Sequence, residues 1–323
     1  MKYFIWILLL AVSIQLPAQR TDHKLESRIE NLIQGFHGVV GVYVHDLKKN
    51  KIVSISPDTV FPTASMVKLS ILLGIMDKMD KGELDYHQRM TYTDSLYYDE
   101  GDDILASFKP GSTIELSKLL LLMLSCSDNT ASLWLQGLAG GGTRINQILD
   151  SLGIKDYRVN SRTPGREAER EEYGWGQTTP RAMENVMERI AIKKDIFSPT
   201  ACDKMLRMLG RQYWDEEALS QIPPGVFCAD KNGAVDQSRS EVVYVNCHHP
   251  YIFCICTKNN QDTSWTYNNE AWVLTRKLSR MLWQYYNPKS TWTGAPVEEP
   301  AGQSTFLNKE RVPQKPGEIA ARF

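Results

Sequence analysis

Apolar side chains recur at two spacings along the chain, and the two spacings predict different elements. Residues 25–36 repeat apolar positions at helical spacing, whereas residues 39–47 and 52–56 alternate as strands do. Residues 65–79 are apolar around most of a helical circumference, which is typical of a buried central helix. Further helices are predicted over 114–124, 130–138, 146–152, 181–192, 200–210 and 268–286, and further strands over 226–229, 241–247 and 251–257.

This order of elements predicts an α+β fold. An antiparallel sheet flanked by helices is built from both chain ends, an all-helical domain is inserted, and the active site lies in the cleft between them. We expect residues 20–62 and 195–287 to form the sheet domain and residues 63–194 the helical domain. The polar stretch 160–177 is expected to be an active-site loop, since long loops in compact domains are often functional. Residues 288–323, rich in Pro, Lys, Glu and Gly, are expected to be a flexible tail.

The N-terminal segment 1–19 has the pattern of a secretory signal peptide. Lys2 supplies a positive charge, residues 3–16 are apolar, and a short region around Ala18 suits cleavage. A secreted or periplasmic protein without stable membrane insertion after cleavage is therefore predicted. An uncleaved membrane anchor is the alternative.

Composition narrows the class of protein. The chain has 323 residues, 42% of them hydrophobic, which is enough to bury a substantial core. Its formal charge of −1 argues against a nucleic-acid or anionic-membrane partner. We expect a monomer that acts on a small molecule.

Cysteine and histidine do not form a metal-binding pattern. The six cysteines lack zinc-site spacing. Cys254 and Cys256 point to one face of a predicted strand, and Cys247 can face one of them across a hairpin, with the pairing left open. His248 and His249 are adjacent, point in different directions and are expected at the surface. No metal or nucleotide cofactor is expected.

The chemistry is carried by three short motifs, of which the first is Ser65-Met66-Val67-Lys68. Positions three apart lie on one helix face, so the Lys68 amine is placed beside the Ser65 hydroxyl. A serine needs such a neighbouring base to act as a nucleophile, and the amine is useful only when deprotonated. Apolar surroundings and a second cation, for which Lys231 is the candidate, would lower its pKa.

The other two motifs are Ser127-Asp128-Asn129 and Lys231-Asn232-Gly233. Ser127 can pass a proton to a leaving nitrogen, and Asn129 can hydrogen-bond the substrate or the catalytic lysine. The backbone N–H groups of Ser65 and Ala234 can stabilise an oxyanion. Each motif alone is common, as a chance S-x-x-K, a helix cap or a hairpin turn. Their joint order favours a serine hydrolase that forms an acyl-enzyme.

From about residue 25 to residue 286, these motifs and their order resemble the class A β-lactamase and penicillin-binding-protein superfamily. Additional segments look like class A segments; they are 92–94, 108–111, 125–131, 178–183 and 231–241. The intervals between the three motifs are also similar to those of the family.

The resemblance implies a role for each motif residue. Ser65 would be the acylated nucleophile, Lys68 its general base or proton relay, and Ser127 the proton donor to the leaving nitrogen. Asn129 would contact the substrate side chain. The substrate carboxylate would be bound by Lys231, Asn232 and Arg239, and the oxyanion by the amides of Ser65 and Ala234.

Two departures from the family pattern matter. Asn232 stands where the family usually carries Thr or Ser. The E-x-x-L-N pattern that supplies the water-activating glutamate is missing. Among the four glutamates of residues 166–172, Glu167 is our first choice, because it lies five positions after Arg162 as in the family loop. Counting back from Pro180 points to Thr163 instead, and a solvated charged loop is the alternative.

These features predict a class A β-lactamase-like serine hydrolase that opens β-lactam amides through a Ser65 acyl-enzyme. One alternative is a D-alanyl-D-alanine peptidase, or another peptidase or esterase acting on peptidoglycan-derived substrates. A second alternative is a non-catalytic protein that binds peptidoglycan fragments.

Overall fold

The computed structural model describes residues 19–98 and 103–299. A six-stranded sheet is ordered β1-β3-β2-β11-β10-β9. Its strands are β1 (Arg20–Thr21), β2 (Val39–Asp46), β3 (Lys51–Ile55), β9 (Phe227–Val235), β10 (Ser238–Asn246) and β11 (Tyr251–Lys258). The β1–β3 pair is parallel, and the other neighbours are antiparallel. Because β11 pairs with β2, the two ends of the chain form one sheet, as predicted.

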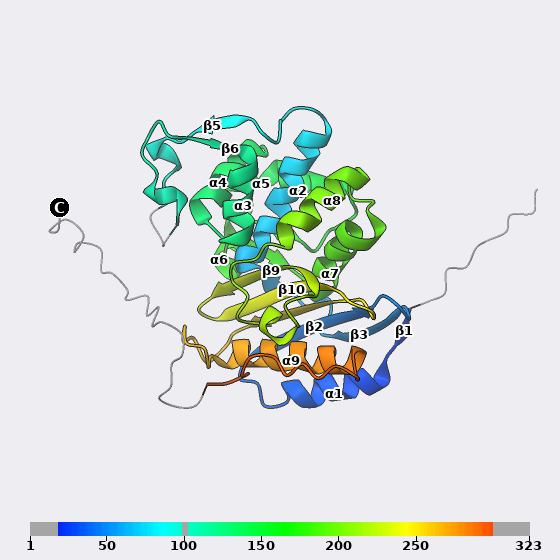
Figure 1. The fold of residues 1–323 in the computed structure, drawn as a ribbon. Coiled ribbons are helices and arrows are strands. Elements are labelled where there is room, and N and C mark those ends of the chain that lie inside the picture. The colour runs from blue at the N-terminus through cyan, green and yellow to red at the C-terminus, as the bar shows by residue number, and fades with distance from the viewer. Residues whose placement is uncertain (1–18, 99–102, 300–323) are drawn as a thin grey trace, which may run out of the picture.

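Helices cover both faces of this sheet (Figure 1). On one face lie α1 (His23–Ile33) and α9 (Glu270–Tyr286), which form a core with inward residues of β2, β10 and β11. On the other face, α7 (Pro180–Glu188) packs on β11, β2 and β10 and joins the larger core of the helical region. Alternating side chains along each strand therefore enter two different cores.

The helical region surrounds α2 (Val67–Asp80), all of whose first ten residues are buried. A helix that is apolar on every side can be stable only inside such a bundle, which agrees with the sequence-based expectation. The remaining α-helices are α3 (Leu116–Ser125), α4 (Asn129–Leu138), α5 (Gly141–Ser151), α6 (Glu167–Tyr173) and α8 (Pro199–Leu209).

Short elements complete the described chain. The minor strands are β4 (Phe61–Pro62), β5 (Arg89–Thr91), β6 (Thr113–Glu115), β7 (Arg158–Val159) and β8 (Gly176–Thr178). The short 3₁₀ and π-helical turns are η1 (Ala64–Met66), η2 (Asp94–Leu96), η3 (Leu105–Ser107), η4 (Arg189–Lys193) and η5 (Leu219–Gln221). Of these, β4, β8 and β7 form a small sheet. Strand β4 precedes η1, and β7 and β8 lie at the two ends of the 160–177 loop, so this sheet connects the loop to the segment before η1.

Several predicted elements differ in detail from the structure. Helix α8 packs against α3 and η4 but also against strand β9, so the domain boundary at residue 195 stays a prediction. Strand β9 continues through the Lys-Asn-Gly motif to Val235, so that motif is not a turn. The loop 160–177 contains the helix α6.

The described part of the predicted tail contacts the sheet domain. Residues 288–299 run back along α9, where the guanidinium Nε of Arg276 donates to the carbonyl of Val297 at 2.9 Å. The rest of the predicted tail and residues 1–18 of the predicted signal peptide lie outside the described residues. Within the described ranges, no helix combines the length and apolar character needed to cross a membrane.

Candidate active site

Ser65 lies in η1, at the point where the chain enters the buried helix α2. The preceding Ala64 has a φ of 42°, in the left-handed region that a residue with a Cβ rarely adopts. Tyr157 holds this junction through two hydrogen bonds. Its hydroxyl donates to the carbonyl of Met66 at 2.7 Å and accepts a hydrogen bond from the amide of Ser70 at 2.8 Å. The serine is thus held on a rigid and locally strained support.

Lys68 is fully buried, and its amine contacts all the motif residues expected around it. The Nζ atom lies 3.0 Å from Ser65 Oγ, 3.0 Å from Ser127 Oγ and 2.7 Å from Asn129 Oδ1. It also donates to the carbonyl of Ser127. Burial, followed by the charge of Lys231, lowers the pKa of the Lys68 amine well below its usual range. A neutral amine in this position can accept a proton.

The Ser127 turn is held by two aspartates. Ser127 has a φ of 59°, and Asp128 caps α4 by accepting the amide of Ala131 at 2.7 Å. Asp103 accepts the amides of Asn129 at 2.9 Å and Thr130 at 2.8 Å. Because these carboxylates satisfy the free N–H groups of the helix start, the Ser127 and Asn129 side chains are presented to Lys68 in a defined geometry.

The third motif lies where β9 passes η1. A Cβ atom at Gly233 would lie 2.3 Å from the carbonyl oxygen of Thr63 and 2.9 Å from the amide nitrogen of Ser65. Only glycine permits this close approach of two backbones. It brings the following residue, Ala234, into the cavity that contains Ser65.

Lys231 is fully buried on the same strand, and its amine donates to Oδ1 of Asn232 at 2.9 Å. Burial lowers the pKa of Lys231, while the nearby Asp230 and Glu241 oppose this shift. Burial in turn raises the pKa of Asp230 and of Glu241. Lys231, Asp230 and Glu241 are therefore interacting, buried ionisable side chains on β9 and the adjoining β10.

A cavity of about 480 Å³ opens over Ser65. Its walls combine polar and aromatic groups, including an edge-to-face pair formed by Tyr98 and Trp175 with ring centroids 5.3 Å apart. The lining residues are Pro62, Ala64, Ser65, Tyr98, Asn129, Glu172, Tyr173, Gly174, Trp175, Ala234, Val235, Gln237, Ser238, Lys258 and Asn259. The volume and the polar groups around the serine suit a small-molecule substrate.

The structure does not support the predicted role of Arg239. Its guanidinium lies 4.4 Å from the ring centre of Trp265 and 4.8 Å from that of Trp272, on the α9 side of the sheet. Successive residues of a strand point to opposite faces, so the neighbouring Ser238 lines the cavity instead. Lys258, which the sequence analysis did not identify, supplies a cationic side chain at the cavity.

The loop glutamates are placed differently from the prediction. Glu167 starts α6, is exposed and accepts the amide of Gly165 at 3.1 Å, and it is not among the cavity-lining residues. Thr163, the other position suggested by counting, is buried against α5, where its Oγ1 closely approaches Gly142. Of the four glutamates, Glu172 lines the cavity.

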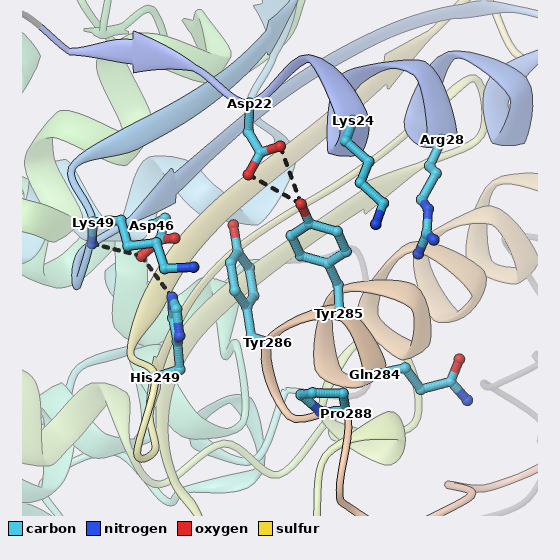
Figure 2. A pocket seen from close by; sticks show the side chains of 10 residues that line it. All are labelled: Asp22, Lys24, Arg28, Asp46, Lys49, His249, Gln284, Tyr285, Tyr286 and Pro288. Atoms are coloured by element: carbon cyan, nitrogen blue, oxygen red, sulfur yellow. Dashed lines mark hydrogen bonds and ion pairs between the residues drawn. The ribbon is translucent and has the colours of Figure 1, made fainter.

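A second cavity, of about 440 Å³, contains none of the predicted site residues. Figure 2 shows it between the start of α1, the β2–β3 turn and the end of α9. There the Tyr285 hydroxyl contacts both oxygens of Asp22 at 3.1 Å, and His249 Nε2 lies 2.7 Å from Asp46 Oδ1. His249 is thus half-buried and not a surface residue, whereas His248 is exposed as expected.

The cysteines are all free thiols in the structure. Cys254 and Cys256 share one face of β11, with Sγ atoms 3.6 Å apart in the core. Cys247 Sγ contacts the carbonyl of His249 and lies in no cysteine pair.

Several supporting residues were not identified from sequence. Tyr157 and Asp103 are single residues in segments without a motif, and their contacts with the Ser65 and Ser127 regions arise only on folding.

The chain is similar in sequence to known proteins of one family. Residues 24–286 match the model of the beta-lactamase enzyme family. A beta-lactamase of Bacteroides uniformis is 27% identical over 73% of this chain and 81% of its own length. Beta-lactamase VEB-1 of Pseudomonas aeruginosa is 24% identical over 83% of this chain and 91% of its own length.

Solved structures show the same fold. A mutant of PBP-A in its acyl-enzyme complex with penicillin G is 25% identical, with a TM-score of 0.73, and covers 84% of this chain and 100% of its own. A representative class A beta-lactamase from Bacteroides cellulosilyticus is 21% identical, also with a TM-score of 0.73, covering 82% and 98%.

Proposed function

The chain belongs to the beta-lactamase enzyme family, and from this premise we propose that it is a class A-like serine hydrolase that opens β-lactam amides through an acyl-enzyme on Ser65. The observation that supports this most directly is the buried Lys68 amine, 3.0 Å from both the Ser65 and the Ser127 hydroxyls. One amine then serves the nucleophile and the proton donor.

The acceptors around Lys68 favour its role as the base. A neutral amine has two N–H bonds and one lone pair. The backbone carbonyl oxygen of Ser127 and the side-chain oxygen Oδ1 of Asn129 can only accept hydrogen bonds. These two acceptors take the two N–H bonds. The lone pair is left for a hydroxyl, so the Ser65 O–H can donate to it as Oγ attacks the lactam carbonyl carbon.

The next steps follow from the positions of Ser127 and the two backbones. The tetrahedral oxyanion would accept hydrogen bonds from the amides of Ser65 and Ala234. When the C–N bond breaks, the Ser127 hydroxyl donates its proton to the lactam nitrogen and recovers one from protonated Lys68, 3.0 Å away. The product of this half-reaction is the Ser65 ester.

Hydrolysis of the ester needs a base for water, and the cavity offers Glu172. We assign the water-activating role to this residue in place of Glu167, because Glu172 lines the cavity over Ser65 and Glu167 does not. Glu172 also hydrogen-bonds the neighbouring Tyr173, whose pKa it raises. A long-lived ester would result if Glu172 activates water poorly.

Substrate binding is assigned to the cavity wall. Lys258 and Ser238 would hold the substrate carboxylate through charge-assisted hydrogen bonds, and Asn129 would contact the substrate side chain. Lys231 and Asn232 belong to the third motif, but they are paired with each other. Lys231 would contribute through its charge, which lowers the pKa of Lys68.

A D-alanyl-D-alanine peptidase is the second candidate, favoured by the absence of the E-x-x-L-N pattern. Both candidates acylate on Ser65, and they differ in how long the acyl-enzyme lives with a β-lactam.

The experiment is intact-protein mass spectrometry of the wild type and Ser65→Ala with a penicillin and a cephalosporin, while ring opening is followed optically. A transient Ser65-dependent adduct with many turnovers is expected. A long-lived adduct would favour the peptidase. No adduct and no hydrolysis would overturn the enzyme assignment for β-lactams and favour a protein that binds peptidoglycan fragments without catalysis.

We also propose that the enzyme works outside the cytoplasm as a monomer, after removal of the signal peptide. The N-terminal sequence of protein recovered from the periplasm or medium, and its mass in solution, test these points.

A further inference from the structure

An imidazole on β2 and two carboxylates on α7 meet where this helix packs on the sheet, and none of the three lines the Ser65 cavity. Figure 1 shows α7 beside β2. Nδ1 of His45 lies 2.9 Å from Glu184 Oε1 and 3.7 Å from Glu188 Oε1, and the three ligand atoms all lie within 4.8 Å of one another. The side chains are 4%, 5% and 12% exposed, respectively. Glu184 and Glu188 are four positions apart, so they share one face of α7.

The opposite side of the imidazole ring sets its tautomer. Nε2 of His45 lies 3.1 Å from Oδ1 of Asn50, which can only accept, so the Nε2–H donates to it. Without an ion, the Nδ1–H donates to Oε1 of Glu184 at 2.9 Å, and a bound ion would take the place of this proton. A metal-binding histidine typically has its second ring nitrogen bound to a carbonyl or carboxylate in this way.

Charge favours a cation at the centre. Two buried carboxylates are costly unless positive charge compensates them. Lys193 pairs with Oε2 of Glu188, the oxygen opposite the one that faces His45. The neighbouring Arg181 is directed to Asp58, with its Nε 2.7 Å from Oδ1. The inner oxygens of Glu184 and Glu188 thus face the His45 ring.

The distances fit a zinc ion. Zinc bonds of about 2.0–2.1 Å in tetrahedral geometry separate neighbouring ligand atoms by about 3.3 Å. The separations of 2.9 and 3.7 Å lie on either side of that value. Glu188 pairs with Lys193, whose side chain is 46% exposed, so this edge of the cluster lies next to a solvent-exposed residue.

We propose that His45, Glu184 and Glu188 bind a divalent transition-metal ion of the zinc class, with a fourth position open to water. The histidine is 139 positions from the first glutamate, which is why no metal motif is visible in the sequence. The site lies outside the Ser65 machinery, so the proposal does not depend on the proposed function.

The test is retention of Zn²⁺ or Co²⁺ by the mature protein after gel filtration, with metal analysis and the visible spectrum of the Co²⁺ form. We expect about one ion per chain in the wild type and at least a tenfold loss of affinity in both His45→Gln and Glu188→Gln. Glu188 lies at the edge of the cluster, so its variant is expected to fold, and circular dichroism verifies this for each protein. His37→Gln is the matched control, since His37 pairs with Glu270 at 2.9 Å on the surface. No ion in the wild type, or unchanged affinity in either cluster variant, would overturn the proposal.

Discussion

The backbone of Gly233 packs so closely against the chain before the nucleophile that a Cβ atom there would lie 2.9 Å from the amide nitrogen of Ser65. The same atom would lie 2.3 Å from the carbonyl of Thr63. Both neighbours are backbone atoms and cannot rotate away. The position of the serine relative to β9 therefore depends on this glycine.

Gly233→Ala should separate β9 from η1, which displaces Ala234 from Ser65. We expect a loss of roughly 100-fold in the acylation rate and about 1–3 kcal/mol of stability from overpacking. Gly137→Ala is the control, since nothing lies within 4 Å of its Cβ position in α4. Stopped-flow acylation and thermal unfolding measure both effects, and equal rates in the two variants would contradict the argument.

Lys231→Met should move the pH dependence of acylation. Protonated Lys68 cannot accept the Ser65 proton, so the rate should fall as the pH falls through the depressed pKa of Lys68. Removing the Lys231 charge removes part of the cause of that depression, and the midpoint of the acid limb should shift to higher pH. Profiles of kcat/KM measure the midpoint. Lys258→Met should leave the midpoint unchanged. An unchanged midpoint in Lys231→Met would refute the effect of the Lys231 charge on the pKa of Lys68.

Glu172→Gln should slow the release of the acyl-enzyme by roughly 100-fold or more while leaving its formation intact, because the base that activates water is lost. Glu167→Gln is the matched variant from the same helix and should release the ester at the wild-type rate. Time-resolved mass spectrometry with a penicillin separates the two steps. The opposite pattern would restore Glu167 as the base.

Lys258→Met should raise the KM for an anionic β-lactam by roughly tenfold, the loss of one charge-assisted hydrogen bond. Arg239→Met should instead lower the melting temperature with little change in KM, because the guanidinium packs on Trp265 and Trp272 away from the cavity. Steady-state kinetics and calorimetry on both variants distinguish the roles. A raised KM in Arg239→Met alone would return the carboxylate site to Arg239.

Tyr157→Phe should cost about 1–3 kcal/mol, since the buried amide of Ser70 loses its acceptor and the Met66 carbonyl its donor. Acylation should slow as well, because the start of α2 is loosened. Tyr285→Phe removes a hydroxyl that contacts Asp22 on the far side of the sheet. This control variant should lower stability and leave the acylation rate unchanged. If Tyr157→Phe also acylates at the wild-type rate, the hydrogen bonds of Tyr157 at the start of α2 are not needed for acylation.

The sequence by itself determined the fold class, the order of the elements and the three motifs. Ser65 and Lys68 are three positions apart on one helix, and a local period of this kind is set by backbone geometry. Likewise, the strands at both chain ends follow from alternation within each short segment.

Only the tertiary structure decided which side chains share the site. Arg239 and Ser238 are adjacent in the chain but lie on opposite faces of β10, and a one-residue difference in register decides which enters the cavity. The same holds for the choice of Glu172 over Glu167, which depends on where α6 begins within an irregular loop. Contacts such as Tyr157 with Met66, or His45 with Glu184, join residues far apart in the chain. No local pattern records them, because they are created by packing.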